Sequence, residues 1–252
     1  MEAYLDNLLL WVKEVWRVLK PTGSFVLSIG DCYKQKQFIS VSSFAYCRII
    51  SETDFVCRNE APWLKPNVPS PIRSRLKHSH EKLFWFVKDA NKYFWDSSAW
   101  LREVTITTKK RAEYGRATQY SQGCFARSFD VGECVSKDKK TIENSWRVVP
   151  AGERQKGFEV SGRGKQVHIA PFPEALVKPW VESLCPIGGT VLDPFVGSGT
   201  VSKVARDLGF NSVGIDLDVG ALEYAKKRIN WGNGVDGHEY EFKVLIGKNL
   251  LG

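Results

Sequence analysis

Hydrophobic residues recur at helical spacing at the start of the chain. The positions that repeat every three or four residues are Leu5, Leu8, Leu9, Val12, Val15, Trp16 and Leu19. This spacing predicts an amphipathic helix over residues 3–19, which Pro21 and Gly23 end. The continuous apolar run from Ser24 to Ile29 then predicts a buried strand.

Similar apolar segments continue on both sides of a long polar stretch. Before it, the pattern predicts a helix over 44–50 and strands over 56–64 and 81–87. After it, the pattern predicts helices over 173–184, 200–208 and 219–229 and strands over 190–192, 212–215 and 241–246. Repeated strand–helix–strand units indicate an α/β fold: a doubly wound, parallel-type sheet with helices on both faces.

The polar stretch, residues 97–167, carries most of the chain's net positive charge of +8. It holds fourteen Lys or Arg against eight Asp or Glu, several glycines and no regular apolar rhythm. Irregular insertions of this length are usually functional or mobile. The charge suits a polyanion-binding face, and it equally suits a solvated, lysine-rich surface. Charge alone leaves both interpretations open.

Composition excludes several classes of protein. A hydrophobic fraction of 43% in 252 residues is ample for a packed core and argues against disorder. No stretch approaches the roughly 20 apolar residues that span a bilayer, and charged residues interrupt the apolar N-terminus, so we expect a cytoplasmic protein without a signal peptide. The six cysteines form no CxxC pair and the four histidines lack ligand spacing, so we expect no metal site.

The sharpest motif is Val191-Leu-Asp-Pro-Phe-Val-Gly-Ser-Gly-Thr200, which follows a predicted strand and opens a predicted helix. Gly197 and Gly199 allow a tight turn and a close approach of the backbone to a ligand. The next strand ends in Gly214-Ile-Asp216, where a carboxylate can accept hydrogen bonds from both ribose hydroxyls of an adenosine-containing ligand. The pattern predicts a nucleoside site at this sheet edge.

Two common nucleotide ligands fit the motif poorly. A dinucleotide fingerprint has a third glycine where this chain has Ser202, and a phosphate-binding P-loop needs a Gly-Lys-Ser/Thr sequence that does not follow. The acidic Asp193 at the turn favours a cationic ligand over a pyrophosphate. S-adenosylmethionine, with its sulfonium and ammonium groups, matches that charge.

At this point the chain resembles a known family, the amino-methylating DNA methyltransferases that modify adenine N6 or cytosine N4. Asp193–Thr200 resembles the family's glycine-rich cofactor motif, and His168-Ile-Ala-Pro-Phe-Pro173 resembles its second cofactor motif. The segments 17–23, 28–33, 63–67 and 75–81 are similar to its motifs on other strands. The motif order is that of the family's beta group, in which the catalytic half precedes the cofactor half, and the similarity covers about two thirds of the chain.

The resemblance implies a Rossmann-like methyltransferase fold with S-adenosylmethionine as cofactor and double-stranded DNA as substrate. It divides the chain into a catalytic half (1–96), a target recognition region (97–167) and a cofactor half (168–252). The expected cofactor residues are Asp193, Pro194, Phe195, Gly197, Ser198, Gly199, Thr200, Asp216, His168, Ala170, Phe172 and Pro173, with Asp31 either a ligand contact or a turn carboxylate. The expected DNA contacts are Lys109, Lys110, Arg111, Arg116, Lys137, Lys139 and Lys140.

The family's catalytic motif, Asp/Ser-Pro-Pro-aromatic, does not occur in this sequence. That motif orients the exocyclic amine of a flipped base and stacks on its ring. Glu60–Trp63 and Pro69–Pro71 share letters with it but lack its context. We therefore expect the sheet to miss one central strand, and expect a second chain or an upstream segment to supply the motif.

Several functions remain open. The leading one is methyl transfer to a base amine in duplex DNA, with cytosine N4 favoured by Ser28–Asp31 and Trp146–Val148, and with a cognate restriction endonuclease as a further partner. The first alternative is a catalytically incomplete module that binds cofactor and DNA. A methyltransferase for RNA or a small molecule is the second alternative.

Overall fold

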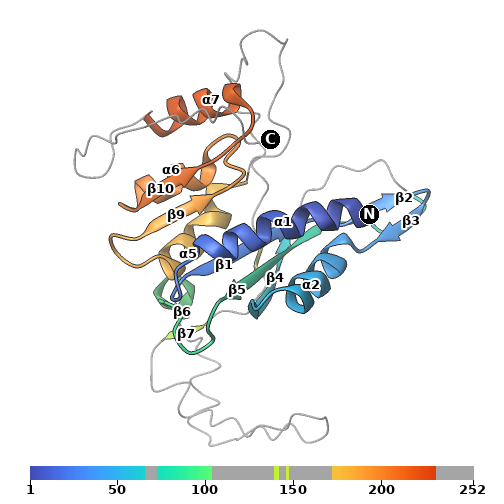
Figure 1. The fold of residues 1–252 in the computed structure, drawn as a ribbon, viewed down its shortest axis with the longest axis horizontal. Coiled ribbons are helices and arrows are strands. Elements are labelled where there is room, and N and C mark those ends of the chain that lie inside the picture. The colour runs from blue at the N-terminus through green and yellow to red at the C-terminus, as the bar shows by residue number, and fades with distance from the viewer. Residues whose placement is uncertain (66–72, 104–138, 142–145, 148–171, 231–252) are drawn as a thin grey trace, which may run out of the picture. The chain divides into compact units, whose positions relative to one another are not determined.

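The computed structural model describes residues 1–65, 73–103, 139–141, 146–147 and 172–230 (Figure 1). The N-terminal elements are α1 (Glu2–Val18), β1 (Ser24–Ile29), β2 (Cys32–Lys34), β3 (Gln37–Ile39), α2 (Val41–Glu52), β4 (Val56–Leu64) and β5 (His80–Val87). The C-terminal elements are β8 (Trp146–Arg147), α5 (Glu174–Leu184), β9 (Thr190–Asp193), α6 (Thr200–Asp207), β10 (Asn211–Gly214) and α7 (Val219–Asn230). These belong to one compact unit, Met1–Trp95 with Asn144–Gly252.

A second compact unit comprises Asp96–Glu143. Its described elements are the 3₁₀ turn η1 (Ser98–Trp100) and the antiparallel strands β6 (Leu101–Glu103) and β7 (Lys139–Thr141). The three-part division expected from the sequence stays a prediction.

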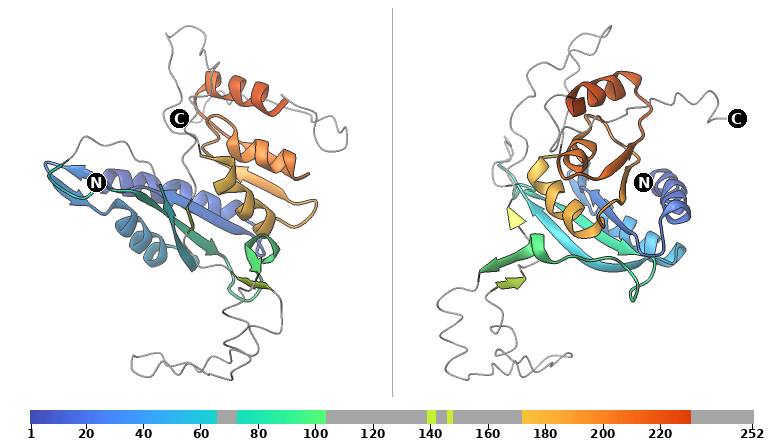
Figure 2. Two further views of the ribbon diagram at one scale, coloured as in Figure 1. Left: turned by 180° about the vertical axis from the view of Figure 1, so that it is seen from behind. Right: turned by 90° about the vertical axis from the view of Figure 1, so that its left-hand side faces the viewer.

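The larger sheet has the order β1-β5-β4-β8. Side chains alternate across a strand, so successive residues of β5 face opposite sides of the sheet. Phe84 and Phe86 join the core under α1 and α2. Trp85 instead lies 6.2 Å from the ring of Trp180 on α5. Helices therefore cover both faces of this sheet, as the side view in Figure 2 shows.

The doubly covered α/β fold is confirmed, but the expectation of a parallel-type sheet is wrong for its largest part. Strand β5 runs antiparallel to both β1 and β4. Among the described strands, only β9–β10 and the short β4–β8 contact are parallel. The order of strands and helices along the sequence does not determine whether two neighbouring strands are parallel. Strand β5 lies between β1 and β4, and its direction depends on pairing with both.

Strands β9 and β10 form a sheet of their own. Within the described residues, β1 pairs only with β5 and β9 pairs only with β10, so each has one edge without a strand partner. This separation is the arrangement expected for a sheet that lacks a central strand.

Element bounds agree closely with the sequence pattern, and the strands over 24–29 and 56–64 match to the residue. The hairpin β2–β3 was not expected. The strand expected over 241–246 lies outside the described residues. None of the described helices is both long and apolar enough to cross a membrane.

Candidate cofactor-binding site

The glycine motif forms a tight loop between β9 and α6. Gly197 and Gly199 both have positive φ, 46° and 76°, and Gly199 is the N-cap of α6. A Cβ at Gly199 would lie 2.8 Å from the Cβ of Ala225 on α7. Both the left-handed backbone and this close approach require glycine at position 199.

The loop is fastened to the end of the neighbouring strand. Gly214 of β10 is aligned with Asp193 of β9 in the parallel register. Two residues beyond Gly214, Asp216 accepts a hydrogen bond from the backbone N–H of Gly197 at its Oδ2 (2.8 Å). Its Oδ1 accepts another from the N–H of Asp218 (2.9 Å). Asp216 therefore lies against the glycine loop, with lone pairs left over for hydroxyl donors.

Asp193 is a carboxylate held in a poorly solvated place. Its Oδ1 accepts a hydrogen bond from the N–H of Phe195 (3.0 Å). Burial raises the pKa of Asp193, the Phe195 hydrogen bond opposes that rise, and the nearby charge of Asp216 adds to it. A cationic group beside these two carboxylates would relieve their mutual repulsion and the cost of burial. The electrostatics of the loop thus suit a positively charged ligand.

Arg228 of α7 donates hydrogen bonds to the same loop. Its Nη1 donates to the backbone O of Ser198 (3.1 Å) and to Oγ1 of Thr200 (2.8 Å). Its Nη2 donates to Oε1 of Glu174 on α5 (3.0 Å). Lys203 of α6 donates to the other oxygen of Glu174 (3.0 Å). These ion pairs connect three helices to the loop, so Ser198 and Thr200 serve to hold the loop's shape.

The structure places the other expected cofactor residues unevenly. Phe195 is 62% exposed and lies edge-on to Trp11 of α1, with ring centroids 4.9 Å apart, and Pro194 is half-buried beside it. The ring centroids of Phe172 and Trp63 of β4 lie 6.1 Å apart, and Pro173 is the N-cap of α5. His168 and Ala170 lie outside the described residues. A ligand contact for these residues stays a prediction.

Asp31 has a local task. Its Oδ1 accepts a hydrogen bond from the N–H of Ser42 in the first turn of α2 (2.8 Å). A carboxylate at a helix N-terminus satisfies a free donor and interacts favourably with the helix dipole. This contact supports the alternative of a turn carboxylate, and a ligand contact by Asp31 is still untested.

Comparison with known proteins decides the family. A profile of the DNA methylase family of N6 and N4 methyltransferases matches residues 1–227. The chain belongs to this DNA methylase family. Among its curated relatives, the type II methyltransferase M.ScaI of Streptomyces caespitosus is 26% identical over 91% of this chain and 68% of its own length. The type II methyltransferase M.HinfI of Haemophilus influenzae is 28% identical over 87% of this chain, but this chain spans only 50% of that relative.

Solved structures show the same fold. The cytosine-N4-specific PvuII DNA methyltransferase superposes with a TM-score of 0.65 at 20% identity, covering 93% of this chain and 73% of that one. The M1.HpyAVI–SAM complex gives a TM-score of 0.54 at 21% identity, covering 89% of this chain and 83% of that one. The Rossmann-like methyltransferase fold expected from the sequence is thereby confirmed.

The expected DNA contacts and the segments that share letters with the catalytic motif are placed as follows. The expected DNA contacts Lys109, Lys110, Arg111, Arg116 and Lys137 lie outside the described residues, whereas Lys139 and Lys140 lie in β7. Glu60–Trp63, one segment with letters of the catalytic motif, lies inside β4 and is paired with β5 throughout. It therefore does not stand at the end of a strand as a catalytic motif would.

The sequence predicted the residues of the loop and missed those that hold it. Arg228 lies in a helix that the periodicity did predict, but it belongs to no motif, and Glu174 is one residue beyond the segment similar to the second cofactor motif. The sequence feature that could have indicated Arg228 and Glu174 is a charged residue on the apolar side of a predicted helix.

Proposed function

We propose that this DNA methylase binds S-adenosylmethionine and takes part in transferring its methyl group to an exocyclic amine of a base in duplex DNA. The observation that carries the proposal is the glycine loop: Gly197 and Gly199 in left-handed conformations, with Asp193 and Asp216 at the ends of adjacent parallel strands. Ligands of open α/β sheets bind at this carboxyl edge. M1.HpyAVI, a protein of the same fold, is known as a complex with SAM, the same cofactor.

The residues fit the cofactor's chemistry. Asp216 would accept hydrogen bonds from the ribose hydroxyls while keeping the loop closed through Gly197. Asp193 would lie near the positive charge of the methionine portion, which its burial makes favourable. The cofactor supplies an electrophilic methyl group; this chain's loop positions it, and the N–H groups at the start of α6 favour polar atoms there.

The basic residues of the segment 97–167, Lys109–Arg111 among them, are proposed to contact the DNA substrate, since the segment carries most of the net charge. Cytosine N4 is the favoured target because the PvuII enzyme of the same fold is named as cytosine-N4-specific. A cognate restriction endonuclease is a further proposed partner, in keeping with the type II names of the curated relatives.

Methyl transfer also needs a group that orients the base amine, and residues 1–252 contain no Asp/Ser-Pro-Pro-aromatic sequence. We propose that a strand from a second chain or an upstream segment carries this motif and inserts between β1 and β9. The free edges of these two strands support this, because an inserted strand would satisfy backbone groups on both. The second candidate function, a module that binds cofactor and DNA without chemistry, rests on the same missing motif.

Calorimetric titration of S-adenosylmethionine tests the cofactor site. Asp216→Ala should weaken binding at least about tenfold, because it removes hydrogen bonds to a charged acceptor. Asp54→Ala, an exposed carboxylate between α2 and β4, should leave binding unchanged. Equal affinities for wild type and Asp216→Ala would contradict the assignment. Transfer of labelled methyl to duplex DNA, assayed with and without a polypeptide bearing the missing motif, separates the enzyme from the inactive module.

A further inference from the structure

A β-hairpin that the glycine site does not use lies just after β1. Strands β2 and β3 are joined by a two-residue turn, Gln35-Lys36, in which both residues have positive φ, 49° and 68°. Two positive φ values are typical of a type I′ turn, whose twist suits a tight hairpin. Neither residue is Gly, Asn or Asp, the residues that adopt positive φ most readily, so the composition of this turn is unusual.

The hairpin carries an exposed aromatic pair that continues into the segment before β5. Tyr33 and Phe38 are cross-strand partners with ring centroids 5.4 Å apart, and they are 37% and 44% exposed. The guanidinium of Arg75 lies 3.4 Å from the centre of the Tyr33 ring. The ring of His78 lies 5.8 Å from Phe38. Hairpin and segment 73–80 thus form one surface, which we call the hairpin surface.

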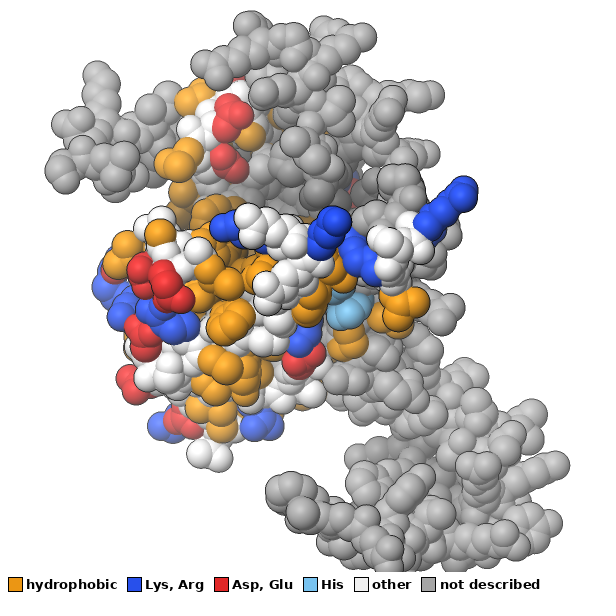
Figure 3. Space-filling view, turned by 90° about the vertical axis from the view of Figure 1, so that its right-hand side faces the viewer, with side chains coloured by type: hydrophobic (Ala, Val, Ile, Leu, Met, Phe, Trp, Pro, Cys, Tyr) orange, Lys and Arg blue, Asp and Glu red, His pale blue; other side chains and the backbone are white. Residues whose placement is uncertain are grey.

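The described residues of the hairpin surface carry several positive charges. Lys34, Lys36, Arg73 and Lys77 are exposed, and within the described part of the chain none of them forms an ion pair. Segments 32–40 and 73–80 contain no Asp or Glu. Figure 3 views the molecule from the side on which β2 and β3 lie in Figure 1. On this face, Lys and Arg side chains gather around a histidine and hydrophobic side chains.

Two neighbouring carboxylates, Asp31 and Glu81, act on His78, but each also has a partner of its own. Asp31 caps α2, and Glu81 forms an ion pair with Lys65. On α2 the situation is reversed: Arg48 alone contacts carboxylates of Glu2, Asp6 and Glu52. Among the described residues, the exposed cations of the hairpin surface therefore lack the carboxylate contacts that Arg48 makes.

We propose that the hairpin surface is a second contact for duplex DNA, separate from the segment 97–167, and that the β2–β3 ribbon lies at the major groove. This inference rests on the proposed function, which makes duplex DNA the substrate. These exposed cations match a phosphate backbone. A two-stranded ribbon fits the major groove of B-form DNA but not the deep, narrow groove of A-form RNA.

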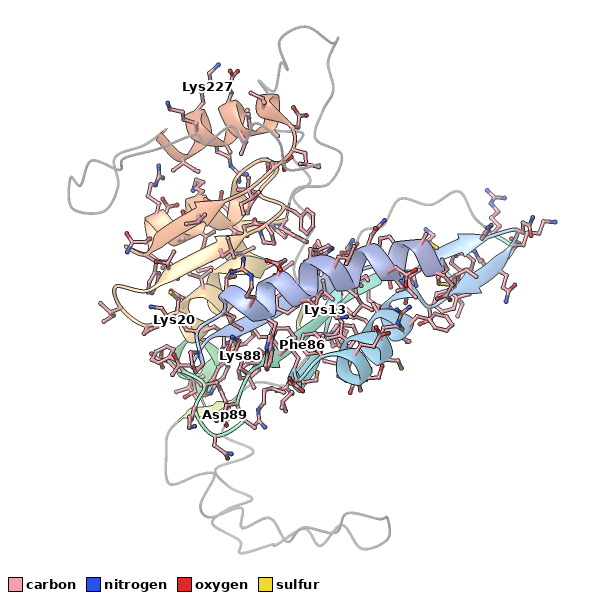
Figure 4. All side chains as sticks on the ribbon, viewed as in Figure 1. Lys13, Lys20, Phe86, Lys88, Asp89 and Lys227 are labelled. Carbon is pink, nitrogen blue, oxygen red and sulfur yellow. The ribbon has the colours of Figure 1, made fainter. Side chains whose placement is uncertain are left out.

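The test uses the full chain and a fluorescent random-sequence duplex of DNA, with affinity measured by anisotropy at several salt concentrations. The variant Lys34→Gln/Lys36→Gln should bind about 5- to 20-fold more weakly at low salt. The slope of log affinity against log salt should fall by about 2, because each lost phosphate contact removes about 0.9. The matched control is Lys13→Gln/Lys20→Gln, which removes the same charge from the exposed side of α1 and the turn after it (Figure 4).

Equal losses in the two variants, or none in either, would overturn the proposal, since net charge alone would then explain binding. A duplex RNA of the same length should bind both variants alike, and a loss confined to RNA would also overturn it. An independent measurement is acetylation of lysines in the wild-type protein: DNA should protect Lys34 and Lys36 and leave Lys13 and Lys20 reactive. This readout needs no variant to fold.

S-adenosylmethionine titration of the same preparations keeps the two hypotheses apart. If the wild type binds the cofactor but the hairpin variant and its control bind DNA equally, the hairpin inference alone fails. If the wild type binds neither cofactor nor DNA, the proposed function fails with it. Unchanged cofactor affinity in Lys34→Gln/Lys36→Gln, together with weakened DNA binding, supports both.

Discussion

The carboxylate of Asp216 and the backbone N–H of Gly197 lie 2.8 Å apart and join the ends of two adjacent parallel strands. The second oxygen of Asp216 accepts from the N–H of Asp218. One carboxylate thus closes the glycine loop and shapes the turn before α7. Both oxygens are used, and that makes the residue sensitive to a change as small as asparagine.

Asp216→Asn should destabilise the protein by about 1 kcal/mol, because an amide offers one acceptor oxygen for two N–H groups. Urea denaturation of the ligand-free protein measures this. The matched control is Asp218→Asn, since Asp218 accepts the N–H of Gly220 through Oδ1 and an asparagine retains that acceptor. A similar loss in both variants would show that charge, and not the second acceptor, matters.

Gly199→Ala should destabilise by about 2–4 kcal/mol, combining the cost of a left-handed alanine with overpacking against Ala225. Gly209 is the control, since its φ of 78° is almost the same but a Cβ there meets nothing within 4 Å. Gly209→Ala should cost only about 1–2 kcal/mol. Ala225→Gly should cost less in thermal denaturation when it is added to Gly199→Ala than when it is made in the wild type, where glycine inside a helix costs about 1 kcal/mol. Equal costs in the two backgrounds would argue against the steric account.

Individual strands, helices and tight turns could be predicted because residues close together in the sequence determine them. The aromatic-rich run through Phe84, Trp85 and Phe86 predicts a strand in the core, and Gly199 predicts a tight turn. Pairing is different: nothing in the β5 segment records that it lies antiparallel between β1 and β4. The hairpin was missed because its turn, Gln35-Lys36, lacks the glycine, asparagine or aspartate that normally signals one.

The candidate site shows the same limit. Asp193, the glycines and Asp216 can be found in the sequence because they lie at fixed distances from predicted strand ends. Arg228 and Glu174 are 54 residues apart and meet only after three helices have packed. Their roles are contacts between elements, so a single sequence carries no periodic or motif signal for them.

Arg228→Lys should destabilise by about 1–3 kcal/mol. The Arg228 side chain is only 11% exposed, and its fork reaches Ser198, Thr200 and Glu174 at once, which a single ammonium group does not. The loss is limited because Lys203 still pairs with Glu174. The control is Lys227→Ala on the outer face of α7 (Figure 4), which should change stability by less than about 0.5 kcal/mol. Chemical denaturation distinguishes them, and equal small effects would remove Arg228 from the loop's support.

Asp193 should give the ligand-free protein an unusual pH dependence. Because burial raises its pKa above the ordinary 3.8, the folded state holds the proton more tightly than the unfolded state. Its contribution to stability is full below about pH 3.8 and is lost as pH rises through the elevated pKa of the folded protein. Asp193→Asn removes the charge but keeps an acceptor for the Phe195 N–H. We therefore expect the variant to be more stable than wild type at neutral pH, with the difference shrinking in acid.

Asp207 provides a control of opposite sign. Burial raises the pKa of Asp207, but hydrogen bonds and charges from Lys203 and Arg206 outweigh it and lower that pKa overall. Its contribution is present above the ordinary pKa and lost as pH falls, so Asp207→Asn should be less stable than wild type at neutral pH. Denaturation between about pH 3 and pH 8 compares the two variants, since both transitions described begin or end near or below pH 3.8. Asp193→Asn should also weaken S-adenosylmethionine binding, because a cation no longer finds its carboxylate; a variant that is stabilised and still binds with wild-type affinity would place the sulfonium elsewhere.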